Sequence, residues 1–420
     1  MKKIFILLII ISFGKVYAQD TLNLTFCRQR TVSTYPLNSD FEHNLKINEL
    51  KIKNIKSIYY PTLNLTGQLI HVSDVPHYVS DNPMLQIPKI DNNQYKIMLE
   101  ARQVIYDGGL TKKQKAMEES SLQVQNKDIE VKLYALNEQV NDVYFMILLF
   151  QEQKRLLELT QKTLYEQLKI VQSGVKNGVL LPGDADVLTA EILRTEQNIS
   201  ELDAGRNSGL EILENLMDTV FTGETVLKVP ELLPVPENPE INRPEYKLLD
   251  AQQVNLQDVS ELNQVKRFPY LAAFGTFGYG YPGLNMLQDK ADIIYTFGLN
   301  LSWTIFDWNK TKHEKQIFAV QQDMINTQRE VFDKNLQIAI AKEKSEIAKL
   351  EDLLQKDEKI IALRKRISTA KASQLKNGVI TSSDYIRELN NETMAKVSRS
   401  LHQIQRLQAI VRYNTLIGQN

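Results

Sequence analysis

The sequence predicts an α+β membrane protein: a homotrimer whose long helices form an α-helical barrel and whose strands, four per chain, form a transmembrane β-barrel. Three observations predict this fold class. Two very long stretches contain neither Pro nor Gly after their first residues and carry apolar residues at helical spacing. Shorter segments alternate apolar and polar residues with a period of two. The second half of the chain repeats the first.

The first 18 residues have the features of a secretory signal peptide. Lys2 and Lys3 precede an apolar run from Ile4 to Ile11, and Val16-Tyr17-Ala18 fits a signal-peptidase site. The apolar run is well short of the ~20 residues that a membrane-spanning helix requires. We therefore expect cleavage after Ala18 and export of the mature chain.

The composition narrows the class of protein further. Cleavage removes three lysines and no acidic residue, which leaves 47 basic residues (50 − 3) against 51 acidic ones and gives no indication of nucleic-acid binding. The single cysteine, Cys27, cannot form an internal disulfide, and Phe26 before it argues against a lipid anchor. No other apolar run reaches the length of a spanning helix, so any membrane-spanning part must consist of strands.

The sequence carries no signature of an enzyme or a cofactor site. The segment from Gly278 to Gly283 matches G-x-G-x-x-G, but a dinucleotide site needs a helix to open there, and Pro282 excludes one. The five histidines share no metal-ligand spacing. We expect no catalytic activity, no cofactor and no metal.

Residues 19–217 form the first predicted repeat, which ends in two helices joined by a Gly- and Pro-containing turn. Its elements are a helix, two strands, a long helix and a return helix, at residues 40–57, 63–69, 95–102, 109–173 and 184–217. At 1.5 Å per residue the long helix extends roughly 100 Å, far more than a globular domain needs. Such a helix indicates an extended assembly.

Residues 218–244 form a Pro-rich connector, and residues 245–420 form the second predicted repeat. Lys376-Asn377-Gly378-Val379 repeats residues 176–179, and Ile305-Phe306-Asp307 corresponds to residues 105–107, both at a separation of 200 residues (376 − 176; 307 − 107). Because the separation is the same at both ends of the long helices, the sequence predicts two long helices of equal length.

The strand predicted from Ile293 to Ile305 has the cleanest alternation. One face carries large apolar residues, predicted to face lipid, at Tyr295, Phe297, Leu299, Leu301 and Trp303. A half-buried strand of a soluble sheet has the same period, but these strands are longer than the usual five or six residues and match the ~9–11 that cross a bilayer. Four strands cannot close a membrane barrel, whereas three copies supply twelve.

The chain as a whole resembles the TolC-like outer-membrane efflux protein family. The resemblance rests on the two-fold repeat and on the Asn-Gly-Val-[Leu/Ile] turns at Asn177–Leu180 and Asn377–Ile380. It implies a homotrimer with its barrel in outer-membrane lipid of a Gram-negative bacterium and its helices in the periplasm. It also implies two protein partners, a periplasmic adaptor (membrane fusion) protein and an inner-membrane pump.

The resemblance also implies roles for two groups of residues. The motif that adaptors engage is matched by Gly178, Val179, Leu180, Gly378, Val379 and Ile380. Asp184 and Asp384 match acidic residues that line the periplasmic constriction, and Arg387 could replace the arginine of a closed-state latch. Threefold symmetry would turn each aspartate into a ring of carboxylates that attracts cations. Aspartate is also favoured in the first turn of any helix, which explains both residues without a pore.

Three functions are compatible with these patterns. The first is a passive exit duct of a tripartite pump for small molecules or metal ions. The second is the outer-membrane duct of a type I protein secretion system. The third is a periplasmic coiled-coil scaffold without a channel, which the alternating strands disfavour because a scaffold has no use for them.

Overall fold

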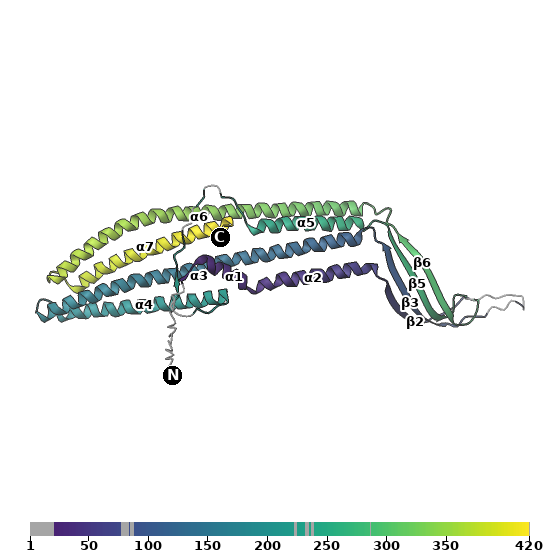
Figure 1. Ribbon diagram of the computed structural model, residues 1–420, viewed down its shortest axis with the longest axis horizontal. Coiled ribbons are helices and arrows are strands. Elements are labelled where there is room, and N and C mark those ends of the chain that lie inside the picture. Colours follow the sequence, from purple (N-terminus) through teal and green to yellow (C-terminus); the bar gives the residue numbers. More distant parts are fainter. Residues whose placement is uncertain are drawn as a thin grey trace, which may run out of the picture. The chain divides into compact units, whose positions relative to one another are not determined.

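The computed structural model describes residues 21–76, 84, 88–221, 225–231, 235–236, 239–285 and 287–419 (Figure 1). The predicted signal peptide lies outside these residues. The chain divides into two compact units that each combine segments of both repeats: one comprises the chain up to Asn38 with Glu130–Pro244 and Phe332–Asn420, and the other comprises Ser39–Ile129 with Glu245–Val331. Two long helices contribute to both units.

The second of these units contains the four predicted strands in one antiparallel sheet. The strands are β2 (Thr62–His71), β3 (Asn93–Tyr106), β5 (Tyr270–Tyr281) and β6 (Asp292–Ser302), in the spatial order β2-β3-β5-β6. Helix α2 (Ser39–Lys56) precedes β2, and α5 (Pro244–Val265) precedes β5. Large apolar side chains are exposed on all four strands, on the inner strands β3 and β5 as well as on the two edge strands.

Strand β6 is shorter than the sequence predicts. The alternation continues to Ile305, but β6 ends at Ser302, so Trp303 lies just beyond the strand rather than in it. The corresponding end of β3 stays in strand conformation to Tyr106 because β5 pairs with it there. The outer edge of β6 has no such neighbour in one chain, and backbone groups without a pairing strand are not held in a ladder.

At each junction between a strand and a long helix, an aspartate side chain caps the first turn of the helix. The Asp107 carboxylate accepts a hydrogen bond from the Thr111 amide at 2.6 Å, and Asp307 accepts one from the Thr311 amide at 3.1 Å. These bonds satisfy backbone donors that the first turn of a helix leaves unpaired. The Thr311 bonds also lower the pKa of Asp307, so its carboxylate stays charged at neutral pH.

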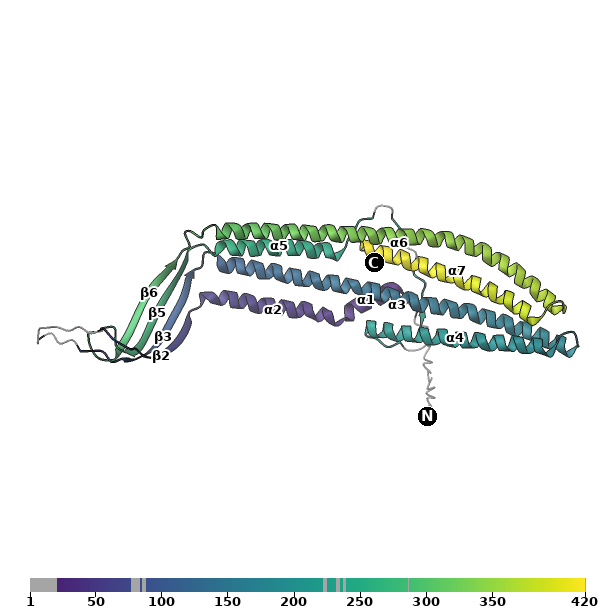
Figure 2. The ribbon, with the colours of Figure 1, turned by 180° about the vertical axis from the view of Figure 1, so that it is seen from behind.

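The long helices have equal lengths, as the repeat predicts. Helices α3 (Leu110–Lys176) and α6 (Lys310–Lys376) each contain 67 residues. The return helices α4 (Pro182–Met217) and α7 (Ser382–Ile417) each contain 36 residues. Figures 1 and 2 show α4 lying along α3, and α7 along α6. No helix in the described ranges is both long and apolar enough to cross a membrane.

The first unit also contains small elements that the sequence does not reveal. Strand β1 (Thr21–Leu22) pairs in parallel with β4 (Val226–Leu227), and helix α1 (Leu24–Thr34) follows β1. The Tyr144 hydroxyl donates to the Leu22 carbonyl at 2.9 Å and ties this pair to α3. Cys27 on α1 is fully buried, and its burial raises the pKa of the thiol to about 12.

Candidate functional site at the helical turns

Each repeat reverses direction at a short turn that follows the long helix. We call residues 177–181 and 377–381 the tip turns. In the first, the Gly178 amide donates to Val175 O at 3.1 Å and the Val179 amide donates to Gly174 O at 2.9 Å. In this arrangement the glycine takes a left-handed conformation, and the amides of the turn donate to the last carbonyls of the helix. Gly178 has φ +71° and Gly378 has φ +69°, so both turns are built alike.

Replacing Gly178 with alanine is expected to lower the free energy of unfolding by about 1 kcal/mol, because an L side chain is strained at positive φ. A Cβ at Gly178 meets nothing within 4 Å, so the cost comes from the backbone alone. Gly183→Ala is the matched control, because Gly183 is equally open but lies in α4 without a positive φ. Chemical denaturation should find the control neutral or stabilised; equal losses in both variants would contradict this assignment.

The six residues that match the adaptor motif do not all lie on the surface. Val179 and Val379 have exposed fractions of 60% and 70%. Leu180 and Ile380 instead pack against a buried cluster formed by both repeats. Leu181 is 73% exposed beside Val179, yet the motif does not include it, because Thr381 takes its place in the second repeat. The apolar surface of the tip turns therefore comprises the two valines and Leu181.

The two tip turns lie against each other. A Cβ on Gly378 would lie 3.4 Å from Val179 O. Away from the turns, the Asn390 amide group donates to the Glu191 carboxylate at 2.9 Å and joins α7 to α4. The tips of the two repeats therefore form one structure.

Both carboxylate oxygens of Asp184 accept hydrogen bonds from backbone amides at helix starts. One carboxylate oxygen accepts from the Leu181 amide at 3.3 Å, and the other accepts from the Ser382 amide at 2.9 Å. Asp184 thus caps its own helix and also the beginning of α7. Asp384 has no corresponding bond to make, because Pro182 stands opposite and lacks an amide hydrogen.

The Asp384 carboxylate interacts with two side chains that are close to it in the chain. The Thr381 hydroxyl donates to its carboxylate at 3.0 Å, and Arg387 pairs with it at 3.3 Å within the same helix. Arg387 also lies 3.7 Å from Glu388 and is largely exposed. The two aspartates, equivalent in sequence, therefore differ in environment: Asp184 binds two backbone amides, whereas Asp384 binds the side chains of Thr381 and Arg387.

Polar residues join α6 to α7 where leucines occupy the same positions of α3 and α4. Arg364 pairs with Glu388 at 3.2 Å. The corresponding residues of the first repeat, Leu164 and Leu188, are fully buried. The periodic pattern of the sequence does not reveal this difference, because both pairs fit an amphipathic helix.

In a second polar set, Ser368 lies one turn nearer to the tip turns than Arg364 on α6, and Glu392 lies one turn further from them than Glu388 on α7. Ser368 donates a hydrogen bond to the buried Glu392 carboxylate, and Lys396 pairs with Glu392 at 2.6 Å. Leu168 and Ile192 replace Ser368 and Glu392 in the first repeat. Burial raises the pKa of Glu392, but the bonds from Lys396 and Ser368 outweigh it and hold the pKa below its usual value. We call the Arg364–Glu388 and Ser368–Glu392–Lys396 sets the polar seam.

The opposite end of α7 is anchored by a hydrogen-bond network at Thr415. Its carbonyl accepts bonds from the Tyr134 hydroxyl at 2.5 Å and from Arg243 at 3.2 Å. Its hydroxyl accepts bonds from Arg28 at 3.2 Å and from Asn141 at 3.4 Å. Because these donors come from α1, α3 and the segment before α5, the C-terminal end of α7 is held on several sides.

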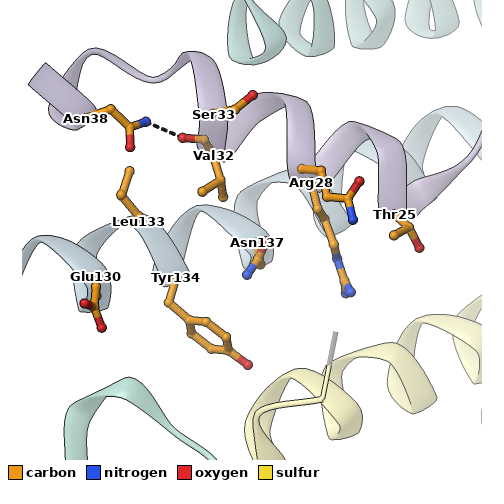
Figure 3. Close-up of a pocket in the computed structure, with 10 residues that line it drawn as sticks. Thr25, Arg28, Val32, Ser33, Asn38, Glu130, Leu133, Tyr134 and Asn137 are labelled. Carbon is orange, nitrogen blue, oxygen red and sulfur yellow. Dashed lines mark hydrogen bonds between the residues drawn. The ribbon is translucent and has the colours of Figure 1, made fainter. Parts of the chain in front are cut away.

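A cavity of about 450 Å³ lies beside this network, between α1 and α3 (Figure 3). It is lined by Thr25, Arg28, Gln29, Val32, Ser33, Asn38, Glu130, Leu133, Tyr134 and Asn137. Figure 3 shows Arg28 and Tyr134 extending across it, and both donate to Thr415 on α7. The cavity therefore belongs to the anchor of α7, and we assign no ligand to it.

Comparisons with known proteins agree with this architecture. The profile of the outer membrane efflux protein family matches residues 42–217. No curated protein sequence matches the chain. The fold is similar to that of CusC, with a TM-score of 0.69 and 12% identity over 94% of this chain and 92% of that one.

Two further solved structures have the same fold. VceC of Vibrio cholerae has a TM-score of 0.65 and 12% identity, over 94% of this chain and 96% of its own. The open-state outer membrane channel MtrE of Neisseria gonorrhoeae has a TM-score of 0.65 and 14% identity, over 94% and 89%. The predicted fold class, with long helices and four antiparallel strands per chain, is confirmed. Residues 42–217 therefore match the outer membrane efflux protein family, and the chain shares its fold with outer membrane channels of this TolC-like kind.

Proposed function

We propose that three copies of the chain form the outer-membrane exit duct of a tripartite efflux pump, which exports small molecules or metal ions passively. Proteins of this family lie in the outer membrane, extend into the periplasm and work as trimers with adaptor and pump proteins. The observation that carries the proposal is the exposed apolar face of β6, where Tyr295, Phe297, Leu299 and Leu301 alternate with Thr296, Gly298, Asn300 and Ser302. That face suits lipid, and the opposite face suits a water-filled pore.

The tip turns are the proposed docking site of the adaptor. Val179, Leu181 and Val379 expose apolar side chains at the point where α3 turns into α4 and α6 turns into α7. Apolar surface of this kind is buried when a partner binds. Leu180 and Ile380 support the turns from within, so we expect their truncation to loosen the tip instead of removing a contact.

Opening is proposed to come from α7 moving against α6. The Thr415 network holds one end of α7, while the polar seam near the tip turns is exposed to water in part. The α3–α4 pair instead has the buried apolar residues Leu164, Leu188 and Ile192 at the seam positions. An adaptor shifts this equilibrium only through contacts that differ between the closed and open states.

Single-channel conductance in planar bilayers tests the duct and its constriction together. Wild-type protein is expected to show discrete cation-selective steps, and Asp384→Ala is expected to reduce that selectivity, because a ring of three carboxylates attracts cations. Asp184→Ala is expected to loosen the tip, since both oxygens of Asp184 hold backbone amides. If selectivity is unchanged in a variant that carries both Asp184→Ala and Asp384→Ala, the proposed duct stands and the proposed ring of carboxylates is refuted. A folded trimer that never conducts, even with adaptor bound, would contradict the duct.

A further inference from the structure

Basic residues are concentrated at the edge of the sheet where the strands meet the helices. Four ten-residue windows at this edge, 51–60, 107–116, 259–268 and 307–316, contain eleven basic and four acidic residues, although the whole chain has a formal net charge of −1. Figure 1 shows the ends of α2, α3, α5 and α6 gathered at this one edge of the sheet. The edge therefore carries a positive charge that the overall composition does not reveal.

Most of this charge is not neutralised within the chain. Three of the basic residues, Lys51, Lys113 and Lys115, form salt bridges with glutamates. The other eight are exposed and form no salt bridge with any residue that the structure describes. Two of the four acidic residues, Asp107 and Asp307, instead cap the first turns of α3 and α6. Six of the exposed basic residues lie on the helices, and we call them the basic collar: Lys53, Lys56, Lys112, Lys310, Lys312 and Lys315.

The collar lysines at the starts of α3 and α6 oppose the helix dipole. Lys112 lies in the first turn of α3, and Lys310 and Lys312 lie in the first turn of α6, and neither turn contains an acidic residue. The first turns of α2, α4, α5 and α7 all contain acidic residues, which the positive end of the dipole favours. Lys53 and Lys56 end α2, where the dipole favours them. The unfavourable charges therefore lie only where a long helix leaves the sheet, and an external anion would compensate them.

Exposed aromatic side chains lie at the same level as the collar. Tyr59 and Tyr60 follow α2, and Phe306 and Trp308 precede α6, with exposed fractions from 40% to 82%. The rings of Phe306 and Trp308 meet edge to face with their centroids 4.9 Å apart. Aromatic side chains collect where the hydrocarbon of a membrane meets the headgroups. The collar lysines lie within two turns of the helix ends, roughly 10 Å, and therefore at the level of the headgroups.

We propose that the basic collar binds anionic phospholipid, such as phosphatidylglycerol, in the leaflet of the outer membrane that faces the periplasm. This inference rests on the proposed duct, which places the sheet in lipid and the helices in the periplasm. Basic segments next to a membrane are attracted by anionic lipids, and the attraction falls off within a Debye length. A zwitterionic lipid has no net charge to offer, so the collar distinguishes between the two lipid classes.

A cavity of about 600 Å³ between α3, α5 and α6 offers one place for a headgroup. Lys315 lines it with an ammonium group that has no salt bridge among the described residues. Gln257 and Ser260 also line it, and their amide and hydroxyl groups can donate hydrogen bonds to phosphate or glycerol oxygens. Glu261 lies in the same lining, but it forms a salt bridge with Lys113, so this pair adds no net charge.

The two tryptophans of the chain, Trp303 and Trp308, both lie at this edge and report on the lipid there. After Trp303→Phe, Trp308 is the single tryptophan, and bromine atoms on neighbouring acyl chains quench its fluorescence. The full chain is reconstituted in phosphatidylcholine vesicles with brominated phosphatidylglycerol or brominated phosphatidylcholine. We expect phosphatidylglycerol to be enriched beside Trp308 at least threefold over its bulk fraction at low salt. The enrichment should disappear in 1 M salt, where the Debye length is about 3 Å.

Two variants in the Trp303→Phe background test the lysines themselves. The test variant replaces the three collar lysines of α6: Lys310→Gln, Lys312→Gln and Lys315→Gln. The matched control removes the same charge from three exposed lysines further along the same helix: Lys334→Gln, Lys342→Gln and Lys359→Gln. The test variant should lose the enrichment, whereas the control should keep it. In a neutral detergent the test variant should melt no lower than the parent, because it relieves unfavourable charges at a helix start.

The outcomes separate the collar from the duct. Equal enrichment in the test and control variants would overturn the collar. A change in the ion selectivity of the test variant, with its lipid enrichment intact, would also overturn it and would place these lysines in the pore. Equal quenching by both brominated lipids, in a protein that conducts, refutes the collar and keeps the duct. No quenching by either lipid refutes both, because this edge of the sheet would then lie outside the membrane.

Discussion

A chain carrying Arg364→Leu and Glu388→Leu is expected to transport at least about tenfold more slowly than wild type, with its conductance steps correspondingly rarer. The two substitutions copy Leu164 and Leu188 of the first repeat into the polar seam. Replacing a partly buried ion pair with well-packed apolar residues is commonly neutral or stabilising by about 1–4 kcal/mol. A closed state that gains 1.4 kcal/mol reduces the open population about tenfold.

The matched control exchanges the partners, Arg364→Glu with Glu388→Arg. It keeps the ion pair, which has a separation of 3.2 Å, and should transport like wild type. Single-channel recordings measure how often the channel opens, and efflux from whole cells measures the rate of transport. If the leucine variant transports normally and is also more stable, α7 does not move against α6 at this position.

The polar seam should also make closure sensitive to acid. Lys396 and Ser368 hold the pKa of Glu392 below the ordinary value of about 4.3 that it would regain if opening separated them, so these bonds stabilise the closed state above that pH. That stabilisation is lost as the pH falls through the lower folded pKa. Open probability should therefore rise below about pH 4 in wild type, and it should rise less after Glu392→Ile, which restores the first-repeat residue.

Removal of the Arg28 side chain is expected to lower the free energy of unfolding by about 2–4 kcal/mol. Arg28 is buried and donates to Asn141 at 2.7 Å and to Thr415 at 3.2 Å. Arg28→Ala would leave both buried acceptors without this donor and enlarge the cavity beside α1. Desolvation lowers the pKa of the guanidinium, but an arginine remains charged at any working pH.

Arg30→Ala is the matched control, since Arg30 lies on the same helix but is exposed. Its substitution should change stability by less than about 0.5 kcal/mol. Chemical denaturation followed by circular dichroism measures both variants. Equal losses would mean that the Thr415 network does not hold α7, and the proposed movement of α7 about its anchored end would lose its basis.

The sequence by itself determined the parts of this protein that repeat. Periodicity identified the long helices, the four strands and the turns, because helices and strands place side chains with periods that the order of residues records directly. The separation of 200 residues between the turns (376 − 176) led to equal helix lengths, which the structure confirms at 67 residues each. Matching turn motifs also led to the family whose profile matches residues 42–217.

Only the tertiary structure decided what distinguishes the two repeats. Asp184 and Asp384 are equivalent in sequence, but Asp184 binds the Ser382 amide, while Pro182, the equivalent of Ser382 in the first repeat, has no amide hydrogen for Asp384. The adaptor motif includes Leu180 and omits Leu181, although packing buries the first in part and exposes the second. Burial and pairing depend on neighbours that are distant in the chain, and local periodicity carries no record of them.

The anchor of α7 was equally hidden from the sequence. Thr415 receives donors from residues as distant as Arg28 and Tyr134, and none of these belongs to a periodic motif. The end of β6 shows the opposite case. Its alternation predicts a strand to Ile305, but one chain supplies no neighbour beyond Ser302. A strand needs a neighbour to pair with, so the alternation in the sequence extends beyond the part of β6 that the single chain holds in its sheet.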